Sequence, residues 1–183
     1  MTYQIMRIMN SDKKEFIEYW SNLYASYDDN EYYKNMKKPL TKEKIDKLFM
    51  WKNGRNISNL KMISIKLNYH PLIEKYKSNN AVSQKDLINA KNGGAIWNIF
   101  MFHILDSEQF PIFDQHVYRA MNYIIEGNIK ELALKREDII KTYLEEYLPF
   151  FNTFMGIEKR KIDKALWEYG KFLKENSKIF LQT

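Results

Sequence analysis

Apolar side chains recur at intervals of three and four residues along most of this chain, the spacing that places them on one face of an α-helix. The first such stretch begins after Ser11, a residue type that caps helix N-termini, and ends at the Asp-Asp-Asn of residues 28–30. Its apolar positions are Phe16, Tyr19, Trp20, Leu23 and Tyr27. Because helical periodicity dominates and Val is scarce, we expect helices throughout.

Single residues predict several helix boundaries. Thr41 is placed as an N-cap, and Gly54 as the residue that follows the end of the same helix. The apolar face of this helix holds Ile45, Leu48 and Phe49. After a short turn at residues 55–58, another helix is predicted through Leu60, Ile63, Ile65 and Leu67, and Pro71 restarts the chain.

The second half of the chain continues the same pattern. Ser83 and Asp86 form the sequence of a capping box before a short helix that ends at residues 91–94. Residues 95–105 are apolar on nearly all sides, which predicts a buried central helix. Helices are also expected from Asp114 to Ile125, over 137–151 and over 157–174. The fold class is therefore all-α, with about nine or ten helices joined by short loops.

Composition narrows the classes of protein. The 183 residues are 45% hydrophobic and 28% charged, typical of a globular chain. The absence of Cys excludes disulfides, thiolate zinc sites and Cys-ligated iron–sulfur clusters. The net charge of +6 has two explanations: a polyanionic partner such as nucleic acid, or a compositional bias toward Lys and Asn.

Location follows from the absence of targeting patterns. No apolar run approaches the roughly 18–20 residues of a membrane span, and residues 1–5 do not resemble a signal peptide. We expect a cytoplasmic protein without membrane contact, which would associate with the nucleoid if it is bacterial.

Two polar features have both a structural and a functional interpretation. Gly93 and Gly94 permit a tight turn between helices, and they equally permit a backbone cradle for phosphate at a helix N-terminus. Asp114 precedes a helix and can cap it, whereas a carboxylate held there beside a cleft can also stabilise a cation or orient water.

The residues around Asp114 carry a resemblance to a known family. The string 114–119, Asp-Gln-His-Val-Tyr-Arg, resembles the segment with the catalytic Asp in the helix–hairpin–helix (HhH-GPD) DNA glycosylases, the superfamily of endonuclease III, adenine glycosylase and 8-oxoguanine glycosylase. In that family a Leu-Pro-Gly-(Val/Ile)-Gly hairpin and one apolar helix precede the Asp. An ungapped superposition places the hairpin on residues 90–94 and the apolar helix on residues 95–105.

A weaker similarity lies upstream, in residues 48–61. This part resembles the family's helix–turn–helix segment, from which a polar residue is inserted into the duplex. Asn53 falls near that position. By this resemblance the duplex contacts are Lys52, Asn53 and Arg55 with Lys91, Asn92, Gly93 and Gly94, while Trp51 and His116 are candidates for the base pocket.

The chain also departs from the family pattern. Lys91 replaces the hairpin Pro, and Asn92 replaces its first Gly. The catalytic Lys of bifunctional members falls at Ile96, so a lyase reaction through a Schiff base is not expected. The cluster-binding cysteines are missing as well.

The resemblance implies a two-lobed fold with one lobe over residues 28–113 and the other formed by residues 1–27 plus 114–183, with Asp114 at the mouth between them. It implies a monofunctional glycosylase, acting as a monomer without a cofactor, that excises a damaged or modified base from double-stranded DNA. The alternatives are an inactive DNA-binding module on this scaffold and a helical interaction protein unrelated to DNA.

The other titratable residues add little to this picture. His103 lies in the predicted buried helix, where a hydrogen-bonded core histidine is expected. No histidine or carboxylate spacing predicts a metal site. Residues 137, 138, 145 and 146 are acidic and are expected on a solvated helix face.

Overall fold

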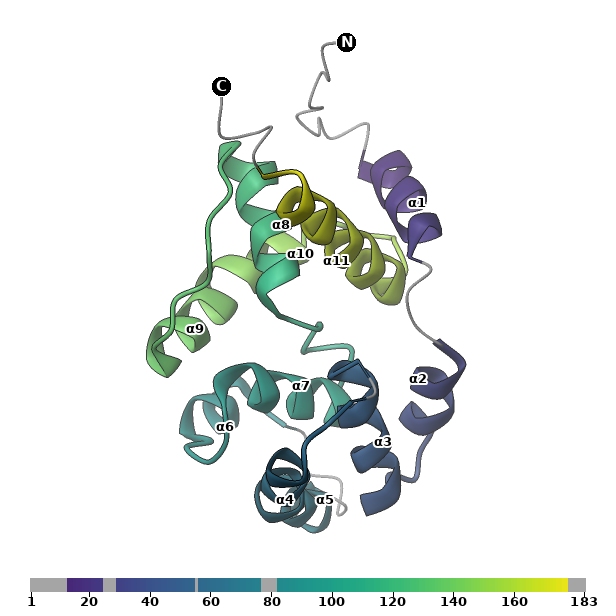
Figure 1. Ribbon diagram of the computed structural model, residues 1–183, viewed down its shortest axis with the longest axis vertical. Helices are drawn as coiled ribbons and strands as arrows, with labels where there is room; N and C mark the ends of the chain where they lie inside the picture. Colours follow the sequence, from purple (N-terminus) through teal and green to yellow (C-terminus); the bar gives the residue numbers. More distant parts are fainter. Residues whose placement is uncertain (1–12, 25–28, 55, 77–81, 178–183) are drawn as a thin grey trace. The chain divides into compact units, whose positions relative to one another are not determined.

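The structure is a computed structural model that describes residues 13–24, 29–54, 56–76 and 82–177 (Figure 1). Every regular element in these ranges is helical, so the all-α prediction is confirmed. Within the same ranges, no helix is both long and apolar enough to cross a membrane.

The chain divides into two compact units. The central unit comprises residues 26–110, and the terminal unit comprises residues 1–25 together with 111–183. The divisions fall after residue 25, where the sequence suggested residue 27, and after residue 110, where it suggested residue 113. Each unit has its own buried core, and each is described by itself.

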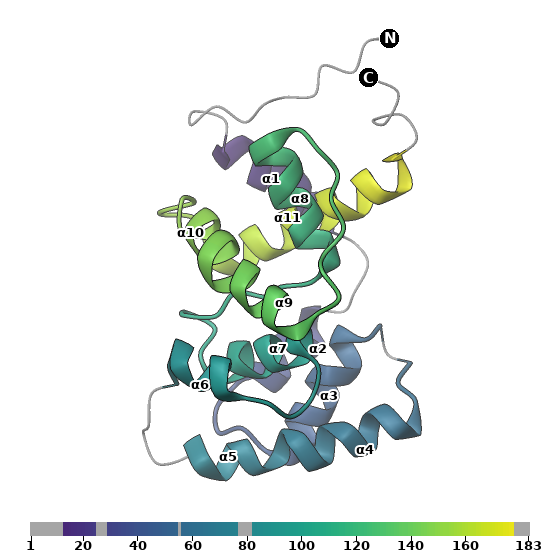
Figure 2. The same ribbon diagram turned by 90° about the vertical axis from the view of Figure 1, so that its left-hand side faces the viewer.

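The central unit consists of short helices around one buried helix. Its elements are α2 (Asp29–Met36), α3 (Lys42–Lys52), α4 (Asn59–Asn68), α5 (His70–Tyr76), α6 (Gln84–Asn89) and α7 (Ala95–Leu105). Figure 2 shows α4 and α5 following one another in nearly the same direction. Helix α7 is buried at eight of its positions, which confirms the predicted central helix.

The predicted caps of the central unit are present. The Thr41 hydroxyl accepts a hydrogen bond from the backbone N–H of Lys44 at the start of α3. Gly54 follows the end of that helix with φ +73°, the left-handed conformation that favours glycine. Ser83 and Asp86 form the complete capping box of α6. These boundaries were predictable because each depends on a contact within three residues.

Two features of the central unit differ from the expectation. Helix α2 begins where residues 28–30 were expected to end a helix, and only Tyr32 and Asn35 of its side chains are buried. Helix α4 lies where predicted, but its only buried side chain is Ile65. The side chains of Leu60, Ile63 and Leu67 are 81%, 53% and 70% exposed, so periodicity located the helix without identifying its buried face.

The terminal unit is organised around its last helix. Its elements are α1 (Lys13–Leu23), α8 (Gln115–Glu126), α9 (Arg136–Thr142), the π-helical turn η1 (Tyr143–Tyr147), α10 (Leu148–Phe151) and α11 (Lys159–Glu175). Helices α1 and α8 both pack against α11, and the aromatic rings of Phe16 and Trp20 contact Tyr169 with centroids 5.1 and 4.9 Å away. The predicted cap Ser11 and the predicted apolar position Tyr27 lie outside the described residues.

Candidate functional site

Asp114 caps helix α8. Its backbone is extended, and its Oδ1 accepts hydrogen bonds from the backbone N–H groups of His116 (2.8 Å) and Val117 (3.2 Å). The predicted capping role is therefore confirmed. The residue is half-buried, and the two N–H donors together with the positive end of the helix dipole stabilise its negative charge.

The extended segment before Asp114 is held by two buried tyrosines. The hydroxyl of Tyr143 donates to the carbonyl of Pro111 (3.1 Å), and that of Tyr147 donates to the carbonyl of Ile112 (3.0 Å). Burial raises the pKa of both phenols well above the ordinary value, so they remain neutral donors. Asp114 is thus held by contacts of the segment that precedes it and by the first turn of the helix that follows it.

Arg119 anchors α8 from inside the terminal unit. Its side chain is 2% exposed, donates to both carboxylate oxygens of Glu131 at 2.9 and 3.1 Å, and donates to the carbonyl of Gly170 at 3.3 Å. The paired guanidinium is compatible with burial because its charge and donors are satisfied.

Helices α8 and α11 are in close backbone contact where His116 meets Gly170. A Cβ on Gly170 would overlap the backbone carbonyl of His116 and lie 3.0 Å from its Cα, so only glycine fits there. The His116 ring lies 5.1 Å from that of Trp167. Burial, with a smaller contribution from the Arg119 charge, lowers the pKa of His116 despite the opposing effect of Asp114. The imidazole is therefore neutral at pH 7.

One face of α11 carries cations and an aromatic ring next to this region. Arg160, Lys164, Trp167 and Lys171 follow one another at intervals of four, three and four residues, which places them along a single stripe. The Tyr24 ring lies 5.4 Å from the Arg160 guanidinium and 5.8 Å from the Lys164 ammonium, and Lys171 lies 5.6 Å from the Trp167 ring. We call these four residues the α11 stripe.

The loop at residues 90–94 joins α6 to α7 in the central unit. Gly93 has φ +79°, and a Cβ there would overlap the Tyr69 hydroxyl, so glycine is required for both backbone and space. The Asn98 side chain donates to the carbonyl of Ala90 (2.7 Å) and accepts from the Tyr69 hydroxyl (3.1 Å). The loop is therefore bound to the helix that it precedes.

The predicted DNA-contact residues of this loop are exposed. Lys91, Asn92, Gly93 and Gly94 all lie on the surface. Gly94 is the N-cap of α7 and supplies no side-chain hydrogen bond to it. The first turn of α7 thus begins behind an exposed, glycine-containing loop, an arrangement suited to anions.

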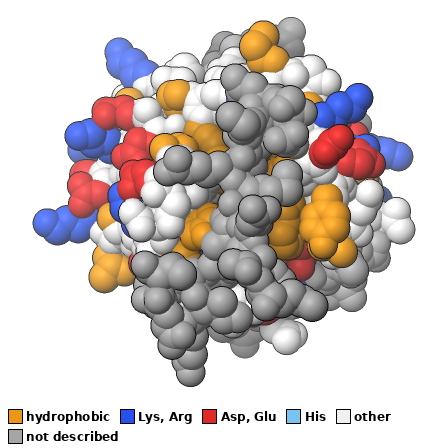
Figure 3. Space-filling model, turned by 90° about the horizontal axis from the view of Figure 1, so that it is seen from above, with side chains coloured by type: hydrophobic (Ala, Val, Ile, Leu, Met, Phe, Trp, Pro, Cys, Tyr) orange, Lys and Arg blue, Asp and Glu red, His pale blue; other side chains and the backbone are white. Residues whose placement is uncertain are grey.

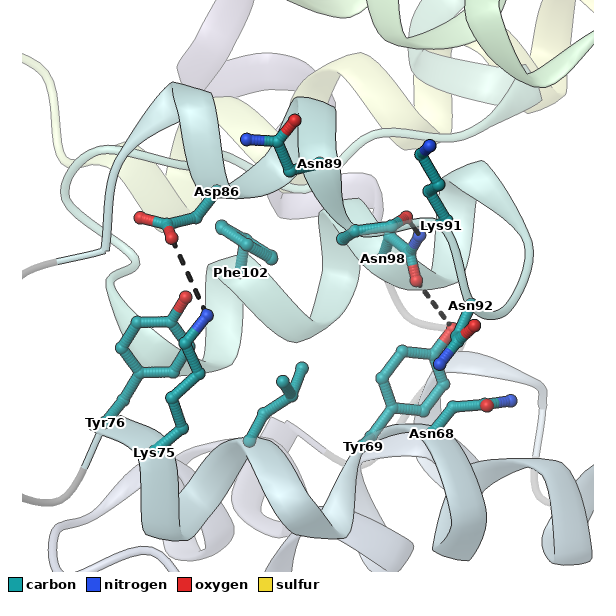
Figure 4. Close-up of a pocket in the computed structure, with 12 residues that line it drawn as sticks. Asn68, Tyr69, Lys75, Tyr76, Asp86, Asn89, Lys91, Asn92, Asn98 and Phe102 are labelled. Carbon is teal, nitrogen blue, oxygen red and sulfur yellow. Dashed lines mark hydrogen bonds and ion pairs between the residues drawn. The ribbon is translucent and has the colours of Figure 1, made fainter.

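A pocket of about 310 Å³ opens beside this loop, between α5 on one side and α6 and α7 on the other (Figure 4). Asn68, Asn92 and Tyr69 are grouped at one end, and Lys75, Tyr76 and Asp86 at the other. Its lining also includes Leu72, Asn89, Ala90, Lys91, Asn98 and Phe102. The pocket belongs entirely to the central unit.

The turn between α3 and α4 holds the remaining candidates. The Asn53 side chain donates to the carbonyl of Asn56 and accepts from the Lys61 ammonium (3.0 Å), so it stabilises the turn itself. Trp51 is 8% exposed and packs against Tyr32, which favours a core role over contact with a base. Lys52 is half-buried, and Arg55 lies outside the described residues.

The remaining titratable residues have structural environments. His103 is buried, with Nε2 2.7 Å from the Tyr32 hydroxyl and Nδ1 2.7 Å from the carbonyl of Phe110, so the expected hydrogen-bonded core histidine is confirmed. No group of three or more ligating side chains in the described ranges has the arrangement of a metal site. The predicted solvated acidic face is confirmed, since all of its members are exposed, namely Glu137, Asp138, Glu145 and Glu146.

The positive charge does not form a single patch on the face seen in Figure 3. There, outside the part drawn in grey, Lys and Arg side chains are interspersed with Asp and Glu. The α11 stripe combines the buried Arg160 with Lys164 and Lys171, and Lys171 pairs with Glu168 at 3.6 Å. The spacing of the stripe was already visible in the sequence.

The structure therefore brings Asp114 and His116 together in the terminal unit, and Lys91 to Gly94 together in the central unit. Sequence reasoning missed the tyrosines that hold residues 111–112, the α11 stripe and the pocket. Comparisons of the chain with protein-family models, with curated proteins and with solved structures found no match.

Proposed function

We propose that this protein is a monofunctional DNA glycosylase-like enzyme with a helix–hairpin–helix scaffold, hydrolysing the N-glycosidic bond of a damaged or modified base in double-stranded DNA. The observation that carries the proposal is the setting of Asp114. Its carboxylate is held by two backbone N–H groups, and the segment before it is fixed by two buried hydroxyls. A carboxylate that is positioned before substrate arrives can act without reorganising.

The reaction requires a negative charge next to the sugar. As the bond between C1′ and the base nitrogen breaks, positive charge develops on the sugar ring, and the Asp114 carboxylate stabilises that charge. The oxygen of a water molecule then forms the new bond to C1′. One proton of that water is transferred to the nitrogen of the departing base. The target base reaches this acid by rotating out of the duplex.

Two features support a DNA partner. The N–H groups at the start of α7 lie behind the exposed loop of residues 91–94, where they are suited to a backbone phosphate. In the α11 stripe the Lys171 ammonium lies next to the Trp167 ring, and an aromatic ring beside a cation is a combination that proteins use to bind nucleic acid strands. Its Trp167 contacts His116, two residues after the proposed catalytic acid.

The proposed reaction ends at base release. The position that would hold a Schiff-base lysine is Ile96, which has no nucleophile. Strand cleavage at the abasic product is therefore not expected.

The test is base release from a panel of lesion-bearing duplexes. The wild type is expected to release a base, and Asp114→Asn is expected to lose at least about a hundredfold in rate, because the amide cannot supply the charge. Asn still caps α8, so the variant should fold. The matched control is Asp106→Asn, since Oδ1 of Asp106 likewise accepts two backbone hydrogen bonds, from Glu108 and Gln109. Absence of release across the panel would overturn the enzyme proposal.

A second candidate is a DNA-binding module on the same scaffold that excises no base. It is favoured by the capping bonds of Asp114, which give this acid a sufficient structural role. It predicts duplex affinity that falls linearly with salt on logarithmic axes, without product.

A third candidate is a helical interaction protein, favoured by the exposed Leu60, Ile63 and Leu67 of α4. It predicts no duplex binding at moderate salt. A gel-shift series over salt concentration separates this candidate from the other two.

A further inference from the structure

The pocket of the central unit combines an apolar interior with carboxamides at one end and an ion pair at the other. Phe102 and Leu72 contribute the apolar surface, from α7 and α5 respectively. Asn68 and Asn92 add carboxamides at the end near Tyr69 (Figure 4). The volume of about 310 Å³ is at the lower end of the range for small-molecule sites.

Several lining groups are already committed to the fold. Asn98 bridges the carbonyl of Ala90 and the Tyr69 hydroxyl, so it shapes the wall and is not available to a ligand. Lys75 and Asp86 form an ion pair at 3.8 Å, and Asp86 also accepts from the Ser83 hydroxyl at 2.6 Å. Their charges compensate one another, which disfavours a ligand that needs an isolated charge.

Besides the exposed Lys91, the lining groups that remain available to a ligand include carboxamides. The Asn92 side chain is exposed, and no hydrogen bond to it is found within the described residues. The Asn68 amide nitrogen donates to the Ser64 hydroxyl (3.0 Å), which leaves its oxygen as an acceptor. A carboxamide offers a donor and an acceptor side by side, the pattern that pairs with the edge of a nucleobase, while apolar side chains contact the faces of a planar ring.

We propose that this pocket binds a nucleobase, with Asn68 and Asn92 reading its polar edge, Leu72 contacting its face and the buried Phe102 lining the interior. The site requires no residue of the terminal unit, so it goes beyond the proposed base excision and does not depend on Asp114. Gly93 is part of its construction, since a side chain there would displace the Tyr69 hydroxyl from the wall.

The experiment is a titration of the ¹⁵N-labelled full-length protein with the four deoxynucleosides, followed by heteronuclear NMR, with deoxyribose and glucose as parallel probes. At least one nucleoside is expected to shift the side-chain amide signals of Asn68 and Asn92, together with the backbone signals of residues 89–94, in a saturable way. Asn68→Ala and Asn92→Ala are each expected to weaken binding about fivefold, the effect of one lost hydrogen bond. The control Asn152→Ala alters an exposed carboxamide of the terminal unit and should leave the affinity unchanged.

Three outcomes would overturn the proposal: no saturable shifts, equal shifts with the free sugars, or shifts confined to α8 and α11. The result is also separable from the catalytic proposal. If the wild type released no base while both it and Asp114→Asn still bound a nucleoside, the pocket proposal would be supported and the enzyme proposal would be rejected.

Discussion

Helices α7 and α8 begin in contrasting ways. The start of α8 is closed, because the Asp114 carboxylate accepts from its first turn and Arg119 anchors the next turn inside the terminal unit. The start of α7 is open, because Gly94 supplies no side-chain cap and the loop before it is exposed. The first arrangement fixes a negative charge, whereas the second leaves an electropositive helix end accessible. The two helix starts are therefore suited to groups of opposite charge.

The largest expected effect tests the bracing of α8. Gly170→Ala should destabilise the protein by roughly 3 kcal/mol or more, because the new Cβ overlaps the backbone carbonyl of His116 and two helices must separate. The sign of the change in unfolding free energy is informative, because Gly→Ala inside a helix ordinarily stabilises a protein by about 1 kcal/mol. Urea denaturation measures the change.

The control for this substitution is Gly94→Ala, at the open helix start. No atom lies within 4 Å of a Cβ built there, and φ is −77°, so a change within about 0.5 kcal/mol is expected. If Gly170→Ala were equally neutral, helices α8 and α11 would not be in the close backbone contact described for His116 and Gly170.

An intermediate effect is expected at the loop before α7. Gly93→Ala places a side chain at φ +79° and against Tyr69, where a Cβ would lie 3.0 Å from the ring carbon Cζ. The cost should be about 1–2 kcal/mol, less than at Gly170, because a side chain can move more easily than a backbone carbonyl. Hydrogen exchange of the Asn98 and Ala90 amides checks the effect, and protection equal to that of the wild type would contradict it.

The smallest effect concerns pH and the closed helix start. The pKa of His116 in the folded protein is lowered from 6.5, mainly by burial, so the unfolded chain binds the proton more readily. Stability should therefore fall as the pH drops from 6.5 through the folded pKa, by at most about 1.4 kcal/mol per pH unit for this one proton. His116→Gln should remove that part of the dependence, as measured by urea denaturation between pH 5 and 8. If His116→Gln and the wild type showed the same dependence of stability on pH, the His116 ring would not be buried as described.

Local chemistry made much of the fold predictable. The caps at Thr41 and Ser83 depend on residues three positions away, and Asp114 depends on its own first turn. The same reasoning failed for α2, where a run of polar residues that suggested a helix end in fact begins a helix. Capping residues start helices as readily as they interrupt them, and the burial of Tyr32 and Asn35 in α2 depends on tertiary packing that the local sequence does not show.

The candidate site was less predictable because its supports are distant in sequence. Arg119 donates to Gly170, and Tyr147 reaches the carbonyl of Ile112. Neither contact follows from a spacing of three or four residues. The sequence suggested Asp114 and His116 as candidates, but the residues that hold them in place became visible only in the folded chain.

The π-helical turn makes this support sensitive to chain length. In η1 the N–H of Leu148 bonds to the carbonyl of Tyr143, one residue more per turn than in an α-helix. Each residue of an α-helix rotates the chain by about 100°. Deleting one residue between Tyr143 and Tyr147 would therefore regularise the helix while turning one phenol away from residues 111–112. The two hydroxyl contacts of Tyr143 and Tyr147 therefore depend on the number of residues between them.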